Sequence, residues 1–302
     1  MRTGQYNDLD EASYRGASEI SKSDLDLVRR DPALYEWSRK APKVEDKDSP
    51  LRFGSLFHKY LLQPEIFERD HVSDVDTRDM VDTVEDIKAI LDSRGISYKK
   101  TARKPELIDL LSLNAPDIQI KELAQREHKA IYGDSIVSLF DMKKLQDMRA
   151  SVLAHPLMAS LLVDGNAEVS FFLEGTFKCR CDYLKDNVII DIKTTGNIDD
   201  IERTVVKYRY HVQAGLYKHI VETITHEHHE FVFCFVGKNI DRETYPVQVF
   251  SLPSDVEDIG LREAFEDYNV LSSFEAMSTV STLTGVKRFF KELRVSEYGE
   301  YL

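Results

Sequence analysis

The stretch from Ala167 to Leu252 constrains the fold most, because short apolar or alternating runs are separated there by turn residues. Gly175 and the Asp186-Asn187 pair divide the first three runs, which predicts antiparallel strands joined by tight connections. One strongly helical run and two more strand-like runs follow. The strand-like runs cover residues 167–175, 176–186, 187–195, 230–238 and 245–252, and the helical run covers residues 205–225. We expect a central mixed β-sheet flanked by helices, in the α/β or α+β class.

The rest of the chain is mainly helical in pattern. Residues 1–17 are polar, so we expect a flexible N-terminus. Helical runs begin at Ser21 or Ser23, near Gly54 and near Asp141, and the chain is helical again after Pro253. We assign the chain to a main domain of residues 18–80 and 120–252, an inserted helical module of residues 81–119 and a C-terminal tail of residues 253–302.

The inserted module has a charge unlike that of the whole chain. Two short helices joined by a basic loop are expected between residues 83 and 113. Residues 83–104 hold six Lys or Arg against three Asp or Glu, a local charge of +3 in a chain of net charge −13. The loop cations are Lys99, Lys100, Arg103 and Lys104. They suit contact with phosphates, although a solvated helical hairpin that only packs would show the same pattern.

The composition excludes several classes of protein. A net charge of −13 argues against a protein that coats nucleic acid with a basic surface, but not against an enzyme with a local basic groove. Three cysteines, Cys179, Cys181 and Cys234, cannot form a four-cysteine zinc or iron–sulfur site within one chain. No secretory signal and no apolar stretch of roughly 18–20 residues is present, so we expect a cytoplasmic protein without a membrane partner.

Two aspartates and a lysine form the candidate catalytic set. Asp182 lies at the end of one predicted strand, and Asp191 and Lys193 lie on the next. Residues two apart leave the same face of a strand, and a hairpin can bring Asp182 beside them. Two carboxylates with a lysine suit a hard divalent cation and a phosphodiester. The lysine can position the attacking water or stabilise charge in the transition state.

The residues around this set favour a functional site over a solvated Asp-x-Lys triplet on the surface. The apolar run Val188–Ile190 leads directly into Asp191, so the acid ends a buried strand. Glu168 on a preceding strand could add a further ligand. Gln213 and Tyr217 are four residues apart on the following helix and share one face.

Other chemistry-bearing residues have simpler interpretations. Cys179 and Cys181 should face the core as small apolar groups, which leaves Arg180 on the other side as a candidate phosphate contact. The run of His226, His228 and His229 is expected to be a solvated loop rather than a metal site. His211, Tyr35 and Trp37 are expected to pack rather than to act.

Six segments of the chain resemble the motifs of a known nuclease superfamily. The segments ISKSDLDLVRRDPALYEW, FGSLFHKYLLQPEIF, AEVSFF, CRCDYL, IIDIKTT and YRYHVQAGLY occur in the order seen in the PD-(D/E)XK nuclease superfamily, and more closely in RecE-type exonuclease VIII. The resemblance covers roughly residues 18–80 and 125–250 and implies a restriction-endonuclease-like core. Cys181 replaces the proline of the superfamily name, and the C-terminal tail does not resemble the family ending.

The resemblance implies roles for individual residues. Asp182 and Asp191 would bind Mg²⁺, with Mn²⁺ able to substitute, and the backbone carbonyl of Ile192 and His58 would join them. Lys193 would be the catalytic lysine. Glu168 would be an auxiliary acid, and Gln213 and Tyr217 would shape the site or contact DNA.

A second resemblance concerns the inserted module. The segments TVEDIKAILDSRGI and KPELIDLL are similar to SAP or HeH/LEM-like helix–extended–helix modules, many of which bind DNA. This resemblance agrees with the basic loop described above.

Together these features lead us to expect a Mg²⁺-dependent exodeoxyribonuclease on linear double-stranded DNA. The RecE resemblance implies 5′→3′ digestion, a 3′ single strand passed to an annealing partner of the RecT type, and a homo-oligomeric ring. The alternatives are a structure-specific nuclease on the same fold and a non-catalytic DNA-binding recombination accessory protein. The intact Asp182, Asp191 and Lys193 set argues against the accessory protein.

Overall fold

The computed structural model describes residues 1–41 and 50–284. The chain divides into two compact units, Met1–Pro50 with Ser151–Leu302, and Leu51–Ala150. The second unit is larger than the predicted insertion, since it also includes the helical run near Gly54 and much of the one near Asp141.

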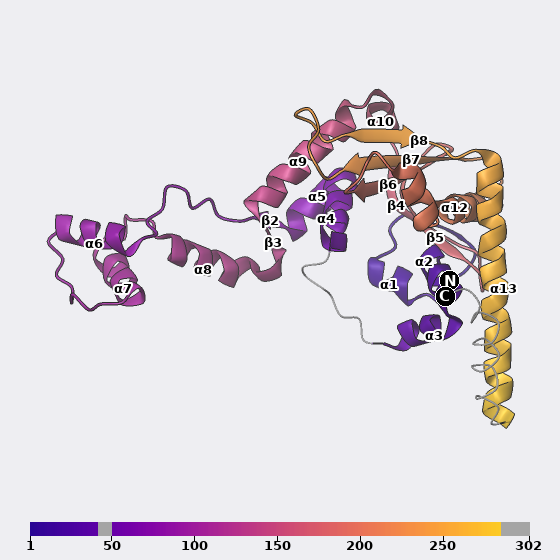
Figure 1. The fold of residues 1–302 in the computed structure, drawn as a ribbon, viewed down its shortest axis with the longest axis horizontal. Coiled ribbons are helices and arrows are strands. Elements are labelled where there is room, and N and C mark those ends of the chain that lie inside the picture. The colour runs from indigo at the N-terminus through magenta and orange to yellow at the C-terminus, as the bar shows by residue number, and fades with distance from the viewer. Residues whose placement is uncertain (42–49, 285–302) are drawn as a thin grey trace. The chain divides into compact units, whose positions relative to one another are not determined.

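The first unit is built on a six-stranded sheet of order β1-β4-β5-β6-β7-β8. Strands β4 to β8 of this sheet are labelled in Figure 1. β6 and β7 are parallel, whereas the other neighbouring strands are antiparallel. The strands are β1 (Gly4–Tyr6), β4 (Asn166–Phe172), β5 (Lys178–Lys185), β6 (Val188–Thr195), β7 (Glu230–Gly237) and β8 (Val247–Phe250). The mixed sheet confirms the expected fold class, and each of the five predicted runs contains one strand.

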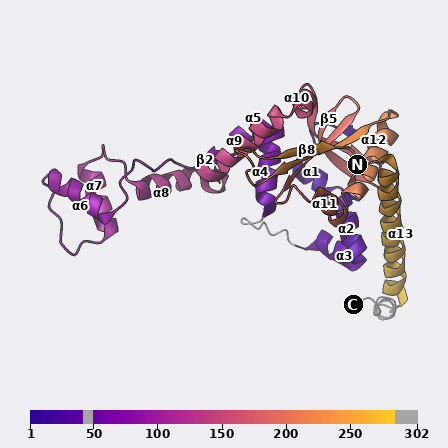
Figure 2. The same ribbon diagram turned by 45° about the horizontal axis from the view of Figure 1, so that its top comes forward.

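Two helices after β6 lead back to the parallel strand β7. They are α11 (Ile201–Lys207) and α12 (Tyr210–Thr225), and α12 contacts β4, β5 and β7. The long helix α13 (Ser254–Thr284) packs along α12 (Figure 2). At this crossing a methyl group on Gly215 or Gly260 would overlap the backbone of the opposite helix. The first part of the predicted tail is therefore a component of the core, and residues 285–302 lie outside the described residues.

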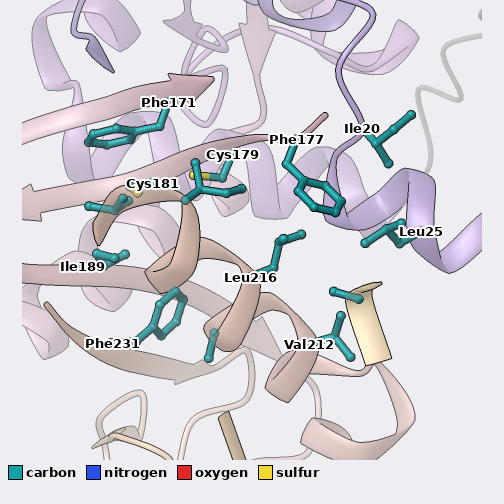
Figure 3. Packing of buried hydrophobic residues seen from close by; sticks show 14 of the residues in the cluster. Ile20, Leu25, Phe171, Phe177, Cys179, Cys181, Ile189, Val212, Leu216 and Phe231 are labelled. Atoms are coloured by element: carbon teal, nitrogen blue, oxygen red, sulfur yellow. The ribbon is translucent and has the colours of Figure 1, made fainter. Parts of the chain in front are cut away.

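The interior between the sheet and α12 is apolar (Figure 3). Cys179 and Cys181 are buried there, which confirms that they act as small apolar groups. Phe171, Leu216 and Phe231 come from β4, α12 and β7 and belong to the same cluster. This packing fixes α12 over the strands that carry the candidate catalytic set.

The N-terminal segment, which the sequence predicts to be flexible, holds a strand and a helix. β1 pairs with β4, and α1 (Glu11–Gly16) begins at the cap Asp10, whose carboxylate accepts from the Ser13 amide. The helical run from Ser21 forms two helices, α2 (Lys22–Arg30) and α3 (Pro32–Lys40), because Asp31 ends the first and caps the second.

The two aromatic residues on α3 differ in burial. Tyr35 is buried, but Trp37 is 65% exposed, so the expectation that both pack in the core is wrong for Trp37. Residues two apart on a helix point in nearly opposite directions, and one face of α3 cannot bury both.

The second unit is mainly helical. Its elements are α4 (Pro50–Leu62), α5 (Pro64–Asp70), β2 (Val72–Ser73), α6 (Val84–Ser93), α7 (Lys104–Asn114), α8 (Lys121–Tyr132), η1 (Gly133–Ser135), β3 (Ile136–Val137) and α9 (Leu139–Ala154), with α9 ending in the first unit. β2 and β3 form a short parallel pair.

Residues 81–123, here called the helical segment, have an apolar cluster of their own. Its buried members are Ile87, Leu91, Leu107, Ile108, Leu111, Ala115 and Ile120. The two predicted helices and the loop between them are present as α6, α7 and residues 94–103.

Candidate active site

The paired carboxylates lie where β5 and β6 part. The last residues paired between these antiparallel strands are Tyr183 and Ile190, so Asp182 and Asp191 are the next residues along each strand. Beyond this last pair, a side chain replaces the backbone as hydrogen-bond acceptor: the Asp182 carboxylate accepts from the Ile192 amide at 2.7 Å. The hairpin therefore brings Asp182 beside Asp191 and Lys193, as the sequence predicts.

Asp191 is a buried charge with side-chain partners on β6 and α12. Only 2% of this residue is exposed. Lys193 Nζ lies 2.6 Å from Asp191 Oδ2, and Gln213 Nε2 on α12 donates to Asp191 Oδ1. A buried carboxylate needs such compensation, because leaving it unpaired would cost several kcal/mol, about 3–5 for a broken buried pair. The helix thus holds one oxygen of Asp191, and the lysine two positions further along β6 holds the other.

Lys193 remains a cation in this environment. Burial alone would lower its pKa, but the charges of Asp191 and Asp182 outweigh burial, and the pKa is raised above its ordinary value. A lysine that stays protonated can stabilise negative charge on a phosphate oxygen but cannot act as a general base near neutral pH.

Glu168 lies opposite Asp182 in the register of β4 and β5. The β4–β5 pairs Ala167–Tyr183 and Val169–Cys181 put Glu168 opposite Asp182. Glu168 has φ of +56°, a left-handed backbone that is unusual for a non-glycine residue inside a strand. Such departures gather at functional sites, and this one interrupts the ladder at the position of the candidate auxiliary acid.

The other predicted helix residue, Tyr217, has an apolar setting. Its ring packs edge-on to Phe231 at 6.1 Å, and burial raises the pKa of its hydroxyl well above the usual value. It lines the core beneath the site, whereas Gln213 contacts the site directly. A role for Tyr217 in DNA contact stays a prediction.

Two residues at the site were missed in the sequence. Lys193 Nζ lies 4.9 Å from the ring centroid of Tyr210, and Lys22 Nζ from α2 lies 5.6 Å from the same centroid. Burial lowers the pKa of Lys22, and the nearby Lys193 charge adds to this effect while Asp26 opposes it. Tyr210 could have been found, because it precedes Gln213 by three residues and shares its helix face. Nothing local in the sequence indicates Lys22.

Arg180, the predicted phosphate contact, is engaged by the N-terminal segment. Its guanidinium pairs with Glu11 at 2.6 Å and donates to the Leu9 carbonyl at 2.8 Å. It also donates to Ser170 Oγ and lies 4.3 Å from the ring centroid of Tyr14. These contacts assign Arg180 to holding α1 and the preceding turn on the sheet. The sequence does not predict these contacts, because the polar composition of residues 1–17 indicates a flexible segment.

Three of the four cations predicted for the basic loop are exposed to solvent. Lys99, Lys100 and Arg103 are exposed. Lys104 differs from the expectation, because its ammonium lies 3.2 Å from Asp82 and 3.5 Å from Glu122. It starts α7 and ties that helix to its neighbours, so it is less available to phosphate than the other three.

The histidines have separate surroundings. His58, the predicted metal ligand, lies on α4 in the second unit, and its role stays a prediction. The run after α12 was expected to be solvated, which is wrong for His229: it is buried, and its Nδ1 contacts the Glu227 carbonyl. His228 is exposed beside Glu222 and Glu230. His211 packs as expected, beside Glu263 of α13.

The donor chemistry at Asp182 and Asp191 suits a hard cation. Carboxylates on neighbouring strands, together with a backbone carbonyl such as that of Ile192, are the oxygen ligands that Mg²⁺ prefers. Within the described ranges, no three His, Cys, Asp or Glu side chains gather into a site by themselves. Mg²⁺ sites commonly combine one or two carboxylates with water and substrate phosphate, so the two aspartates can anchor such an ion.

Comparison with known families agrees with this geometry. The chain matches, over residues 33–272, the family described as "PDDEXK-like domain of unknown function (DUF3799)". It belongs to this family. The matched range of the PDDEXK-like domain contains Asp182, Asp191, Lys193 and Gln213, and its lower bound falls within α3.

Structural comparison gives the same fold. A crystal structure from Eubacterium rectale, described as a "Putative exonuclease", aligns with a TM-score of 0.52 at 13% identity, covering 88% of this chain and 87% of that chain. At this identity the similarity establishes the fold alone. A search of curated proteins found no match. Among the described residues, no helix combines the length and the apolar character needed to cross a bilayer.

Proposed function

We propose that this PDDEXK-like domain is a divalent-metal-dependent deoxyribonuclease that digests linear double-stranded DNA from an end. The observation that carries the proposal is the juxtaposition of Asp182 and Asp191 in strand register, with Lys193 held 2.6 Å from Asp191. Family membership and the exonuclease-like fold support nuclease chemistry at this position.

Each residue has a distinct part in the proposed reaction. Asp182 and Asp191 would hold Mg²⁺ or Mn²⁺, which when bound supplies Lewis-acid stabilisation of the phosphate and lowers the pKa of a water ligand. Lys193 supplies a fixed positive charge close to the reacting phosphate. Gln213 fixes the orientation of the Asp191 carboxylate, and the Ile192 amide fixes that of Asp182. Pre-set polar groups of this kind lower the barrier because they need no reorganisation during the reaction.

The finer parts of the proposal rest on the RecE-type resemblance. They are 5′→3′ digestion, a RecT-type annealing partner for the 3′ strand, a ring-shaped homo-oligomer around DNA and location in the cytoplasm. The exposed cations Lys99, Lys100 and Arg103 are proposed to add phosphate contacts from a SAP/HeH-like module.

A nucleotide-release assay tests the proposal. Linear duplexes labelled at either the 5′ or the 3′ end are incubated with the protein in Mg²⁺ and in chelator. We expect release only with metal, with mononucleotides appearing first from the 5′ label and none from a closed circular duplex. Release from the 3′ label first would reverse the proposed polarity, and cutting of the circle would replace exonuclease by endonuclease action.

A matched pair of lysine variants ties the activity to this site. Lys193→Ala should reduce release by about 10³-fold or more, because it removes charge stabilisation of the transition state. Lys185→Ala, at the end of β5 beside Asp186, should retain activity. Equal activity of the two variants would exclude the proposed site, and absence of metal-dependent release by the wild-type protein would exclude the proposed function.

A further inference from the structure

The turn between α11 and α12 adopts a strained backbone next to the candidate site. Arg209 has φ of +53° and ψ of +45°, a left-handed conformation that non-glycine residues seldom adopt. Its guanidinium is held by Asp26 at 3.3 Å, Glu263 at 3.1 Å and Asp267 at 2.6 Å, from α2 and α13. Three carboxylates from two other helices hold the Arg209 side chain in this turn. A strained backbone that the surrounding structure holds in place often marks a functional site, so the residues on either side of Arg209 are candidates for a function.

This turn stacks two tyrosines that a continuous helix would separate. Residues two apart on a helix point in nearly opposite directions, yet the rings of Tyr208 and Tyr210 stack at 5.8 Å with an interplanar angle of 28°. Lys22 adds a further restraint, because its Nζ donates to the Tyr208 carbonyl at 2.6 Å. The pair is therefore fixed both through Arg209 and through the backbone of Tyr208.

The stacked pair connects the catalytic lysine to solvent. Tyr210 is the inner ring, packed against Phe233 and Phe235 and 4.9 Å from Lys193 Nζ. Tyr208 is the outer ring and is 49% exposed. An aromatic surface thus extends from the candidate site to the outside of the first unit.

A cation accompanies the exposed ring. Lys207 Nζ lies 5.2 Å from the ring centroid of Tyr208, and Lys207 is itself exposed. An exposed aromatic ring with an ammonium over it matches the two parts of a nucleotide, because the ring can stack on a base once the flexible lysine turns to the negatively charged phosphate. Such a face accepts any base, because every base has a π-face.

We propose that Tyr208 is a stacking platform for an unpaired nucleobase of the DNA strand that enters the Asp182–Asp191–Lys193 site. This inference rests on the proposed function and deepens it. Tyr208 would hold one base as a strand is drawn from the duplex, and Tyr210 would support the platform from beneath. Its contribution is to substrate binding, since Tyr208 does not contact the carboxylates or Lys193 in the described structure.

Substitution at Tyr208 provides the first test, by nucleotide release from a linear duplex in Mg²⁺. Tyr208→Ala should raise KM by about 5-fold to 100-fold with little change in kcat, the range expected for loss of one base–aromatic stack. Tyr208→Trp and Tyr208→Phe should retain the wild-type KM, since each keeps a flat ring. The matched control is Val206→Ala, which removes a side chain that is 70% exposed in the same turn region but makes no stack, and it should leave KM unchanged.

A binding measurement supplies a second readout. In the Asp191→Asn background, which keeps DNA uncut, a duplex with 2-aminopurine in its terminal nucleotide should lose fluorescence on binding as the base stacks. Adding Tyr208→Ala should abolish this quenching, and adding Val206→Ala should not. Thermal unfolding midpoints within a few degrees of the wild type show that the turn remains folded.

Three results would overturn the inference. They are a KM for Tyr208→Ala within twofold of that for Val206→Ala, unchanged quenching in the Tyr208→Ala variant, or a fall in kcat alone, which would assign Tyr208 to supporting Tyr210 beneath Lys193. Failure of the proposed function has a different signature, because the wild-type protein itself would then release no nucleotides.

Discussion

The candidate site on the sheet and the basic loop of the helical segment hold charge in opposite ways. Asp191 is buried, and its partner Gln213 is 22 residues away in sequence. Lys99, Lys100 and Arg103 are exposed and belong to one short loop. A buried charge must be matched by groups brought together by the fold, whereas an exposed one is satisfied by water. The fixed, buried charges of the candidate site suit chemistry at a single bond. The exposed cations of the loop suit contact with the phosphates of a nucleic-acid backbone.

The largest expected effect comes from breaking the buried arrangement at its centre. Asp191→Asn keeps the side-chain size but removes the charge that Lys193 faces. Nucleotide release should fall by about 10³-fold or more, since a proposed metal ligand and an oriented charge pair are lost together. The measurement is kcat/KM on end-labelled duplex, with circular dichroism as the check on folding. Asp186→Asn, at an exposed aspartate in the β5–β6 turn, is the control and should behave as wild type.

A smaller effect should follow from removing only the support of Asp191. Gln213→Ala leaves both carboxylates and the lysine but frees one oxygen of Asp191 from its donor. Loss of such orienting groups commonly costs about 10-fold to 100-fold in activity or metal affinity. We expect a higher Mg²⁺ concentration for half-maximal activity, with a smaller loss at saturating Mg²⁺. Activity that drops as far as in Asp191→Asn, at every Mg²⁺ concentration, would mean that Gln213 acts on the substrate itself.

The sheet and the central residues of the site could be predicted from the sequence because they depend on short-range patterns. Alternation within strands and the turn signals between them predicted β4 to β8, and the two-residue spacing predicted that Asp191 and Lys193 share a face. The four-residue spacing on α12 predicted that Gln213 and Tyr217 share a helix face, and the family resemblance implied that this face borders the site. These features require only the neighbours of each residue in the chain.

The features that the sequence did not predict depend on contacts between distant segments. Arg180 is bound by residues about 170 positions earlier, in a terminal segment whose polar composition concealed β1 and α1. Lys22 reaches Tyr210 only because α2 packs against α12. The left-handed backbone of Arg209 is imposed by carboxylates of other helices, and no turn residue in the sequence indicates it.

Neutralising the exposed cations of the basic loop tests whether they contact DNA phosphates. The triple variant Lys99→Gln, Lys100→Gln and Arg103→Gln should weaken DNA binding without changing kcat. If each cation contacts one phosphate, the slope of log affinity against log salt should fall by about 2.7, at about 0.9 per phosphate of duplex DNA. Filter binding or fluorescence anisotropy over a salt series measures the slope. Glu85→Gln and Asp92→Gln on α6 serve as controls, because they remove negative rather than positive charge. An unchanged slope in the triple variant would assign the loop to packing alone.

The smallest expected effect is on the local stability of the helical segment, through the charge of Asp82. Asp82 accepts from Lys121 at 2.8 Å and Lys104 at 3.2 Å, which ties the starts of α7 and α8 together, and these hydrogen bonds lower the pKa of Asp82 below 3.8. A carboxyl whose folded pKa is depressed stabilises the fold above its unfolded pKa and loses that contribution as pH falls through the folded pKa. Amide hydrogen exchange in α7 should therefore be faster in Asp82→Asn than in wild type at pH 6, and the difference should shrink between about pH 5 and pH 3, around the ordinary Asp pKa. Because all three groups are partly exposed, the difference should be small, and it should also shrink as salt is added. A difference that stays constant over this pH range would show that the Asp82 side chain stabilises the segment by its shape rather than by its charge.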